Sequence, residues 1–279
     1  MLSSLRTGQS QLSFDVPGNN LATVASSPEL TLSEYATGAG ALYLGVNTTV
    51  APLDDRTVRQ ALAWAIDRER ILKQVLGGYG LASATPWPKS SPAFTEAART
   101  HYRHDPAKAR ELLKSAGHTR LDLPLLHLAL PGDTAIAEAI QYDLKQIGVQ
   151  VTLQPTDPAT AQKKLISQSM PGLWTMGHGF AQVQPSTLAV SAYPFNEAKN
   201  TSKFRSAAYT KVVREAWTTP ETGARANALR QQITDTLLDE AFIIDLAIRG
   251  SVQVAGKKLH GVALNKFSYL DLDNAYLAG

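Results

Sequence analysis

The 279-residue sequence contains no cysteine, which excludes disulfide bonds, thiolate metal sites and cysteine nucleophiles. It also lacks any apolar run near the ~20 residues needed to span a bilayer, and its beginning has no apolar core of signal-peptide length. If the protein works outside the cytoplasm, we expect its export signal to have been removed or to belong to an upstream segment. Absence of cysteine suits either redox compartment, so composition does not determine the location.

The sequence also has little excess charge of either sign. The formal net charge is +3, and the 27 Lys and Arg residues are distributed along the chain among 24 Asp and Glu residues. Nucleic-acid binding normally requires basic residues clustered on one surface, so we expect no nucleic-acid partner. The hydrophobic content of 44% is sufficient for one large core or two smaller ones.

Catalytic and metal-binding motifs are missing as well. The sequence has no Gly-x-Ser-x-Gly, His-Glu-x-x-His, phosphate loop or Gly-x-Gly-x-x-Gly. His101 and His104 precede a helix without a carboxylate in metal-site register, and the acidic pair Asp54 and Asp55 is explained by a helix start. We therefore expect no enzyme activity, no cofactor and no metal site.

What is present is a series of well-marked helices and strands. Residues 41–46 form an apolar run typical of a buried strand, and residues 53–76 show one continuous helical face. Asp54 or Asp55 can cap that helix, and Gly77 supplies its left-handed end. The three prolines within residues 82–94 predict a loop.

Strands and helices then alternate, which predicts an α/β fold in which helices pack on a sheet. The predicted strands are 121–130, 149–153, 172–176, 242–248 and 251–254, and the predicted helices are 106–116, 134–147, 157–170, 206–217 and 221–238. Residues 177–200 are irregular and long enough to indicate a ligand-facing loop. We expect the last twenty residues to be irregular.

Three segments carry a family resemblance. Residues 43–47 with 51–69 resemble the signature of dipeptide-, oligopeptide- and nickel-binding proteins, a strand ending in Asn followed by Val-Arg-x-Ala-Leu-x-x-Ala-Ile-Asp-Arg. Residues 102–117 and 144–151 are similar to two further motifs of that family. The resemblance implies a lobe of the type II periplasmic-binding-protein class, a mixed sheet flanked by helices, in which Arg56, Arg59, Asp67 and Arg68 hold the signature helix by ion pairs.

The resemblance covers only the carboxy-terminal half of the family. Residues 5–14 resemble a stretch deep inside full-length members. We therefore expect residues 1–46 to be a remnant of a first lobe, 47–248 to be the second lobe, and 249–279 to return to the first lobe. By resemblance, the protein is a periplasmic solute-binding component of an ABC importer that works with a permease, and its amino-terminal half is missing.

The same resemblance indicates where a ligand would bind. In the family, the ligand faces the strand before the signature helix and the irregular loop after a later strand. The candidate ligand-binding residues are therefore Tyr43, Asn47, Trp174, His178, Phe180 and Gln182. Two other interpretations stay open, because strand aromatics are often core residues and an Asn at a strand end often serves a turn.

The ligand expected from the sequence is not restricted to ordinary peptides. Peptide-binding members carry acidic residues in the later loop, which can pair with a peptide ammonium group. Here Gln182 and Gln184 stand near the expected positions, while His178 could complete the coordination sphere of a metal chelate. The missing acids favour a neutral, anionic or chelated ligand, or no ligand at all, and the resemblance leaves the peptide, opine-like and metal-chelate classes open.

Three rival functions remain at this point. Related lobes occur as ligand-sensing domains of transcriptional regulators, although no helix-turn-helix is recognisable in this sequence. An enzyme on the same scaffold is disfavoured by the missing motifs. A truncated lobe without binding activity predicts a broad exposed apolar patch where the absent half would pack.

Overall fold

The structure is a computed structural model that describes residues 2–14, 16, 18–35, 40–179, 184–264 and 269–279. The helices are α1 (Leu2–Arg6), α2 (Gly18–Ala25), α3 (Arg56–Ala65), α4 (Arg68–Arg70), the π-helical turn η1 (Ile71–Val75), α5 (Glu96–Arg99), α6 (Pro106–Ser115), α7 (Pro131–Lys145), α8 (Pro158–Ile166), α9 (Pro185–Ser191), α10 (Ala207–Thr218) and α11 (Ala224–Glu240). The strands are β1 (Leu12–Ser13), β2 (Leu30–Tyr35), β3 (Ala41–Val46), β4 (Gly80–Ala82), β5 (Leu121–Leu128), β6 (Val149–Thr156), β7 (Leu173–His178), β8 (Ile243–Arg249), β9 (Ser251–Gly256), β10 (Leu259–His260), β11 (Ala263–Leu264), β12 (Leu270–Asp271) and β13 (Tyr276–Leu277).

A six-stranded mixed sheet in the order β4-β8-β3-β7-β5-β6 forms the centre of the larger part of the molecule. β5 pairs in parallel with β6 and β7, whereas β3 pairs antiparallel with β7 and β8. Every residue of β3 is buried, as expected for a strand that is covered on both faces. The prediction of a mixed sheet flanked by helices is confirmed.

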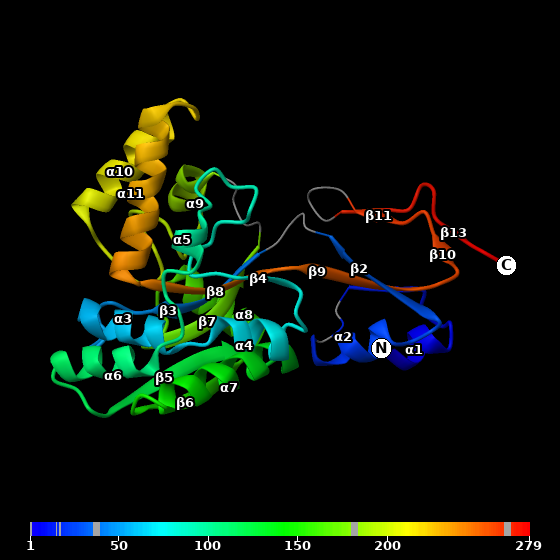
Figure 1. Cartoon of the computed structure of the whole chain (residues 1–279), viewed down its shortest axis with the longest axis horizontal. Helices are drawn as coiled ribbons and strands as arrows, with labels where there is room; N and C mark the ends of the chain where they lie inside the picture. The colour runs from blue at the N-terminus through cyan, green and yellow to red at the C-terminus, as the bar shows by residue number, and fades with distance from the viewer. Residues whose placement is uncertain (1, 15, 17, 36–39, 180–183, 265–268) are drawn as a thin grey trace.

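The two faces of this sheet carry different helices. Leu42, Leu44 and Val46 point into a core that is shared with α3, α6 and α7. Tyr43 and Trp174 belong to an aromatic core on the other face, which includes residues of α9, α10 and α11. Figure 1 shows these two helix groups on opposite sides of the strands.

A second, three-stranded sheet in the order β1-β9-β2 lies beside the larger one. A single residue, Gly250, joins β8 to β9, so the chain passes directly from one sheet to the other. Leu5, Leu21 and Val254 form a small core between this sheet, α1 and α2. Both termini lie at this end of the molecule (Figure 1).

The prediction of one continuous helix over residues 53–76 is wrong, because the structure divides this segment into separate helical elements. Asp55 caps α3 by accepting a hydrogen bond from the Thr57 amide at 2.6 Å, but the helix ends at Ala65 because Ile66 is extended. Asp67 then caps a new turn by accepting from the Arg70 amide at 2.9 Å. The apolar face continues across this break, so periodicity alone could not reveal it.

The ion-pair interpretation of the signature residues is partly wrong. Arg59 pairs with Glu240 at 3.1 Å and Arg56 approaches the same carboxylate at 3.7 Å. The Asp67 carboxylate lies 3.6 Å from a ring nitrogen of His104. Arg68 instead donates to main-chain carbonyl groups, and no carboxylate of the described chain lies within ion-pair distance of it.

Two segments predicted to be irregular contain regular structure. The region 177–200 includes the helix α9, and the last twenty residues include the short paired strands β11 and β12. Elements of two to seven residues show too few repeats for hydrophobic periodicity to be visible. The predicted loop at 82–94 is confirmed, and it holds the buried Trp87, whose indole donates to the Thr234 hydroxyl at 2.9 Å.

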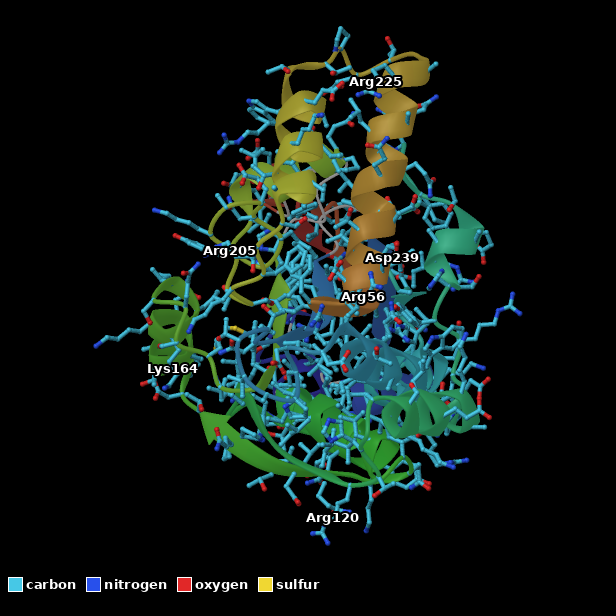
Figure 2. All side chains as sticks on the ribbon, turned by 90° about the vertical axis from the view of Figure 1, so that its left-hand side faces the viewer. Arg56, Arg120, Lys164, Arg205, Arg225 and Asp239 are labelled. Carbon is cyan, nitrogen blue, oxygen red and sulfur yellow. The ribbon has the colours of Figure 1, made fainter. Side chains whose placement is uncertain are left out.

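The basic side chains are spread over the surface, as the sequence indicates. Figure 2 shows Arg56, Arg120, Lys164, Arg205 and Arg225 at well separated positions on one end of the molecule. Among the described residues, no helix has the length and apolar character needed to cross a membrane.

Candidate functional site

The antiparallel pair β3 and β7 brings three of the predicted site residues onto one face of the sheet. Tyr43 lies opposite Met176, and Trp174 lies opposite Gly45. His178 follows two residues after Met176, so it points to the same face at the end of the strand. The prediction that distant segments converge at this pair of strands therefore has a geometrical basis.

Tyr43 and Trp174 fill the aromatic core in this structure, with exposed fractions of 1% and 0%. The Tyr43 ring packs edge-on against Phe195 at a centroid distance of 6.1 Å. Burial raises the pKa of the Tyr43 phenol, so that group stays protonated. A direct ligand contact by either side chain stays a prediction.

Asn47 lies at the opposite end of β3 from His178. Its side-chain NH₂ donates to the Met170 carbonyl at 3.0 Å, and its side-chain oxygen accepts from the Thr49 hydroxyl at 2.8 Å. His178 pairs with Ala41, so about six residues of strand, roughly 20 Å, separate it from Asn47. The structure does not bring these two candidates together, and it engages the Asn47 amide in a turn.

His178 is the candidate nearest to the surface. It is half-buried, its ring lies edge-on to Phe195 at 6.3 Å, and both neighbouring glycines, Gly177 and Gly179, are exposed. Burial lowers the pKa of His178, so the imidazole is uncharged near neutral pH and keeps a lone pair for a metal or a donor. Phe180 and Gln182 lie outside the described residues.

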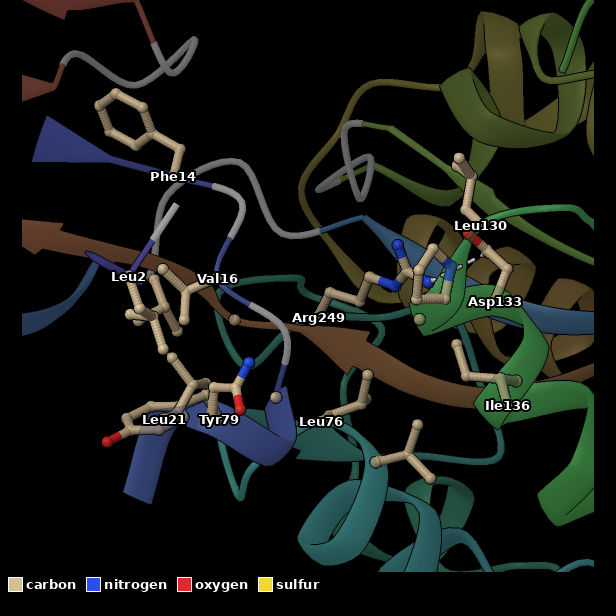
Figure 3. A pocket seen from close by; sticks show the side chains of 17 residues that line it. Leu2, Phe14, Val16, Leu21, Leu76, Tyr79, Leu130, Asp133, Ile136 and Arg249 are labelled. Atoms are coloured by element: carbon tan, nitrogen blue, oxygen red, sulfur yellow. Dashed lines mark ion pairs between the residues drawn. The ribbon is translucent and has the colours of Figure 1, made fainter. Parts of the chain in front are cut away.

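A cavity of about 840 Å³ was not foreseen from the sequence. It lies between the amino-terminal segment, η1, the start of α7 and the β8–β9 crossing (Figure 3). The guanidinium group of Arg249 lies on its wall, 3.7 Å from the Asp133 carboxylate. A Cβ atom placed on Gly177 would be 3.8 Å from that guanidinium, so Arg249 packs against β7 on the face of the sheet opposite to His178.

No sequence signal could have found this cavity. Its lining comes from four segments between residue 2 and residue 252, and none of them is a motif by itself. Among the described residues, no three His, Asp or Glu side chains are grouped so that they could hold a metal ion.

A buried carboxyl group lies directly beside the site residues. Asp245 of β8 is opposite Tyr43 in register, is 1% exposed, and has one oxygen without a hydrogen-bond partner. Burial raises the pKa of Asp245 well above its usual value, and the nearby Arg68 only partly offsets this. The native state therefore favours the protonated carboxyl.

Asp245→Asn is expected to stabilise the protein, and the gain should grow with pH. The unfolded carboxyl loses its proton near pH 4, whereas the folded one keeps it, so wild-type stability falls as pH rises from there toward the folded pKa. The expected gain is therefore largest at about pH 8 and close to zero at about pH 4. Urea unfolding across this range measures it, with the exposed Asp239→Asn as control. A difference that is independent of pH would contradict the assignment.

The fold and site together define a lobe of the type II periplasmic-binding-protein class. The family model for bacterial extracellular solute-binding proteins, family 5 Middle, matches residues 1–200, which is more than half of the chain. The chain therefore belongs to the family 5 bacterial extracellular solute-binding proteins.

Individual relatives agree with this family membership. The probable ABC transporter periplasmic-binding protein SapA of Escherichia coli K12 is 29% identical over 287 residues, which cover 100% of this chain and 51% of SapA. The dipeptide-binding protein of Pseudomonas aeruginosa PAO1 is 26% identical, with 95% of this chain and 50% of that protein covered. The chain thus spans about half the length of these relatives.

A solved structure shows the same fold. The dipeptide binding protein of Pseudoalteromonas sp. SM9913 in complex with Met-Leu matches with a TM-score of 0.84 at 21% identity. That match covers 99% of this chain and 56% of the other. NikA of Staphylococcus aureus in complex with Ni(L-His)2 matches with a TM-score of 0.79 at 19% identity, covering 96% and 57%.

Proposed function

We propose that this chain is the ligand-binding carboxy-terminal part of a periplasmic solute-binding protein that delivers a small molecule to an ABC importer permease. The observation that carries the proposal is the convergence of Tyr43, Trp174 and the half-buried His178 on one face of the β3–β7 pair. An uncharged, partly exposed imidazole can bind a ligand reversibly. No nucleophile or acid–base pair is part of this arrangement, which supports binding without catalysis.

The relatives support peptides, opine-like compounds and metal chelates as proposed ligand classes. The Pseudoalteromonas structure contains Met-Leu, and the NikA structure contains Ni(L-His)2. His178 favours a chelate for this chain, because it can supply one ligand to a metal that already carries others. The periplasmic location and the permease partner are part of the same proposal, and SapA is described as a periplasmic-binding protein.

The two sheets support a revised proposal for the lobe boundaries. We propose that residues 41–248 form the second lobe and that residues 1–40 and 249–279 belong to the first lobe. The sequence analysis placed β3 with the first lobe, but β3 is hydrogen-bonded between β7 and β8 in the six-stranded sheet. The proposed boundary therefore moves from residue 46 to residue 40.

The first-lobe part exposes an apolar surface. Leu272, Tyr276 and Leu277 are 52%, 61% and 57% exposed, and they lie beside a shallow apolar hollow that includes Leu12. Because the relatives are about twice as long as this chain, we propose that polypeptide equivalent to their first half covers this surface. Adding that polypeptide should raise the Tm and suppress self-association, which analytical ultracentrifugation measures.

The test of the proposed function is binding by the purified chain. Native mass spectrometry is expected to detect a small molecule, and thermal shift is expected to respond to Met-Leu or to Ni(L-His)2. His178→Ala should weaken chelate binding at least tenfold without lowering the Tm of the free protein, because the side chain is only half-buried. His118→Ala, at a similarly half-buried position away from β7, is the matched control.

A lobe without binding activity of its own is the second candidate, and the half-length coverage of the relatives favours it. It predicts no response to peptides or chelates and strong self-association through the exposed apolar surface. If His178→Ala binds the ligand as well as the wild type does, the solute-binding function is supported but His178 is not part of the site.

A further inference from the structure

The cavity beside β7 has two chemically different walls. Figure 3 shows that Leu2, Val16, Leu21 and Tyr79 gather on one side, while Arg249 extends from the β8–β9 crossing toward Asp133 on the other. A ligand that fills such a space needs an apolar body and one polar end. Which polar group the ligand carries depends on the hydrogen-bond donors and acceptors that remain free on the charged wall.

Arg249 has unused donors. Its Nη2 atom is 3.7 Å from the nearest Asp133 oxygen, which is longer than the ~2.7–2.9 Å of a charge-assisted hydrogen bond. Its Nε atom has no hydrogen-bond partner in the described part of the chain but is fully buried, so only the terminal Nη atoms can face a ligand. The Arg249 side chain is nevertheless 38% exposed, so the guanidinium can be reached from the cavity.

The position of this guanidinium is fixed by the fold. The Arg249 amide donates to the Gly40 carbonyl at 2.8 Å, and the residue ends β8 immediately before Gly250 joins the second sheet. Burial lowers the pKa of Arg249, and the Asp133 carboxylate partly offsets this effect. A planar, always-charged fork with free N–H groups matches a carboxylate better than any neutral group.

Asp133 limits what the charged wall can accept. Its carboxylate is 14% exposed and belongs to the first turn of α7. It repels an anion that approaches Arg249, but it can accept from an ammonium group attached to the same ligand. The pair therefore favours a carboxylate ligand, with additional affinity for one that also carries an amine.

We infer that this cavity binds a small carboxylate with an apolar body, and that Arg249 is the residue that selects the carboxylate. The inference rests on the proposed solute-binding function and adds a second site, this cavity, with a ligand chemistry of its own. The carboxylate accepts from the free donors of Arg249, and the apolar body lies against Leu21 and Tyr79. His178 has no part in this contact.

The test compares ligands that differ only at the polar end. Calorimetry of the full chain with octanoate and with 1-octanol is expected to show at least tenfold tighter binding of octanoate. Arg249→Gln should remove that preference and leave octanol binding unchanged, and the exposed Arg120→Gln should behave as wild type. Asp133→Asn should bind octanoate several-fold more tightly because the repelling charge is gone.

Comparing the binding of Met-Leu with that of its carboxy-terminal amide tests whether the bound carboxylate belongs to a peptide or to a simple acid. Tighter binding of Met-Leu than of its amide, lost in Arg249→Gln, supports the inference for peptides; octanoate selectivity alone supports it for simple acids. Absence of octanoate and Met-Leu binding, or equal binding by wild type and Arg249→Gln, overturns it. A thermal shift with Ni(L-His)2 that depends on His178 would then still support the proposed function, so the two can fail separately.

Discussion

Gly45→Ala is expected to destabilise the protein by about 3 kcal/mol or more, because a methyl group has no space at this position. A Cβ atom on Gly45 would lie 2.1 Å from Cε2 of Trp174 and 2.3 Å from Cζ2. Trp174 is opposite Gly45 on β7 and fully buried, so the indole has no free direction in which to move. Urea unfolding monitored by circular dichroism measures the loss.

A matched control separates the clash from a general effect of replacing glycine. Gly132 is in the first turn of α7, and no atom lies within 4 Å of a Cβ at that position. Gly132→Ala should therefore leave stability unchanged or raise it by about 0.5 kcal/mol. In the double variant with Trp174→Leu, the cost of Gly45→Ala should fall, since the smaller side chain leaves space. Equal costs with and without Trp174 would contradict this account.

Arg68→Ala is expected to cost about 3–5 kcal/mol, an effect comparable to breaking a buried ion pair. The Arg68 side chain is 5% exposed and donates to the carbonyl oxygens of Asp245 at 2.7 Å and Ala63 at 3.0 Å. A third hydrogen bond reaches the Tyr102 carbonyl at 3.2 Å. Truncation leaves these buried acceptors unpaired and opens a cavity between the signature helix and β8.

Arg56, which belongs to the same signature segment, provides the control. The Arg56 side chain is 58% exposed and lies 3.7 Å from Glu240, so Arg56→Ala should cost no more than about 0.5 kcal/mol. Arg68→Lys should recover only part of the lost stability, because an ammonium group cannot reproduce the guanidinium geometry. Unfolding free energies of the three variants test both points. A cost for Arg68→Ala as small as that for Arg56→Ala would show that the buried hydrogen bonds contribute little.

The local elements were predictable where two independent signals coincided. Asp105 caps α6 by accepting from the Lys108 amide at 2.9 Å, and Pro106 occupies the first helical position as predicted. Asp157 caps α8 in the same way. A capping side chain and an apolar period act over three or four residues, so the sequence alone contains the whole interaction.

The candidate site was predictable only in part. The convergence of Tyr43, Trp174 and His178 follows from the family resemblance, and the pairing of β3 with β7 explains it. The separation of Asn47 from His178 by the length of β3 could not be anticipated from motifs that name residues without their register. For the same reason, the sequence did not indicate that Gly45 leaves room for the Trp174 indole.

By itself, the sequence determined the family, the α/β class and the capped helices, because these depend on short-range patterns and on contiguous motifs. Only the tertiary structure decided where the signature helix breaks, which side chains are core, and that a cavity with a charged wall lies beside β7. Each of these results depends on contacts between distant segments, such as Arg68 with Asp245, which are 177 residues apart. Such contacts form only when the sheet brings the segments together, so no local pattern encodes them.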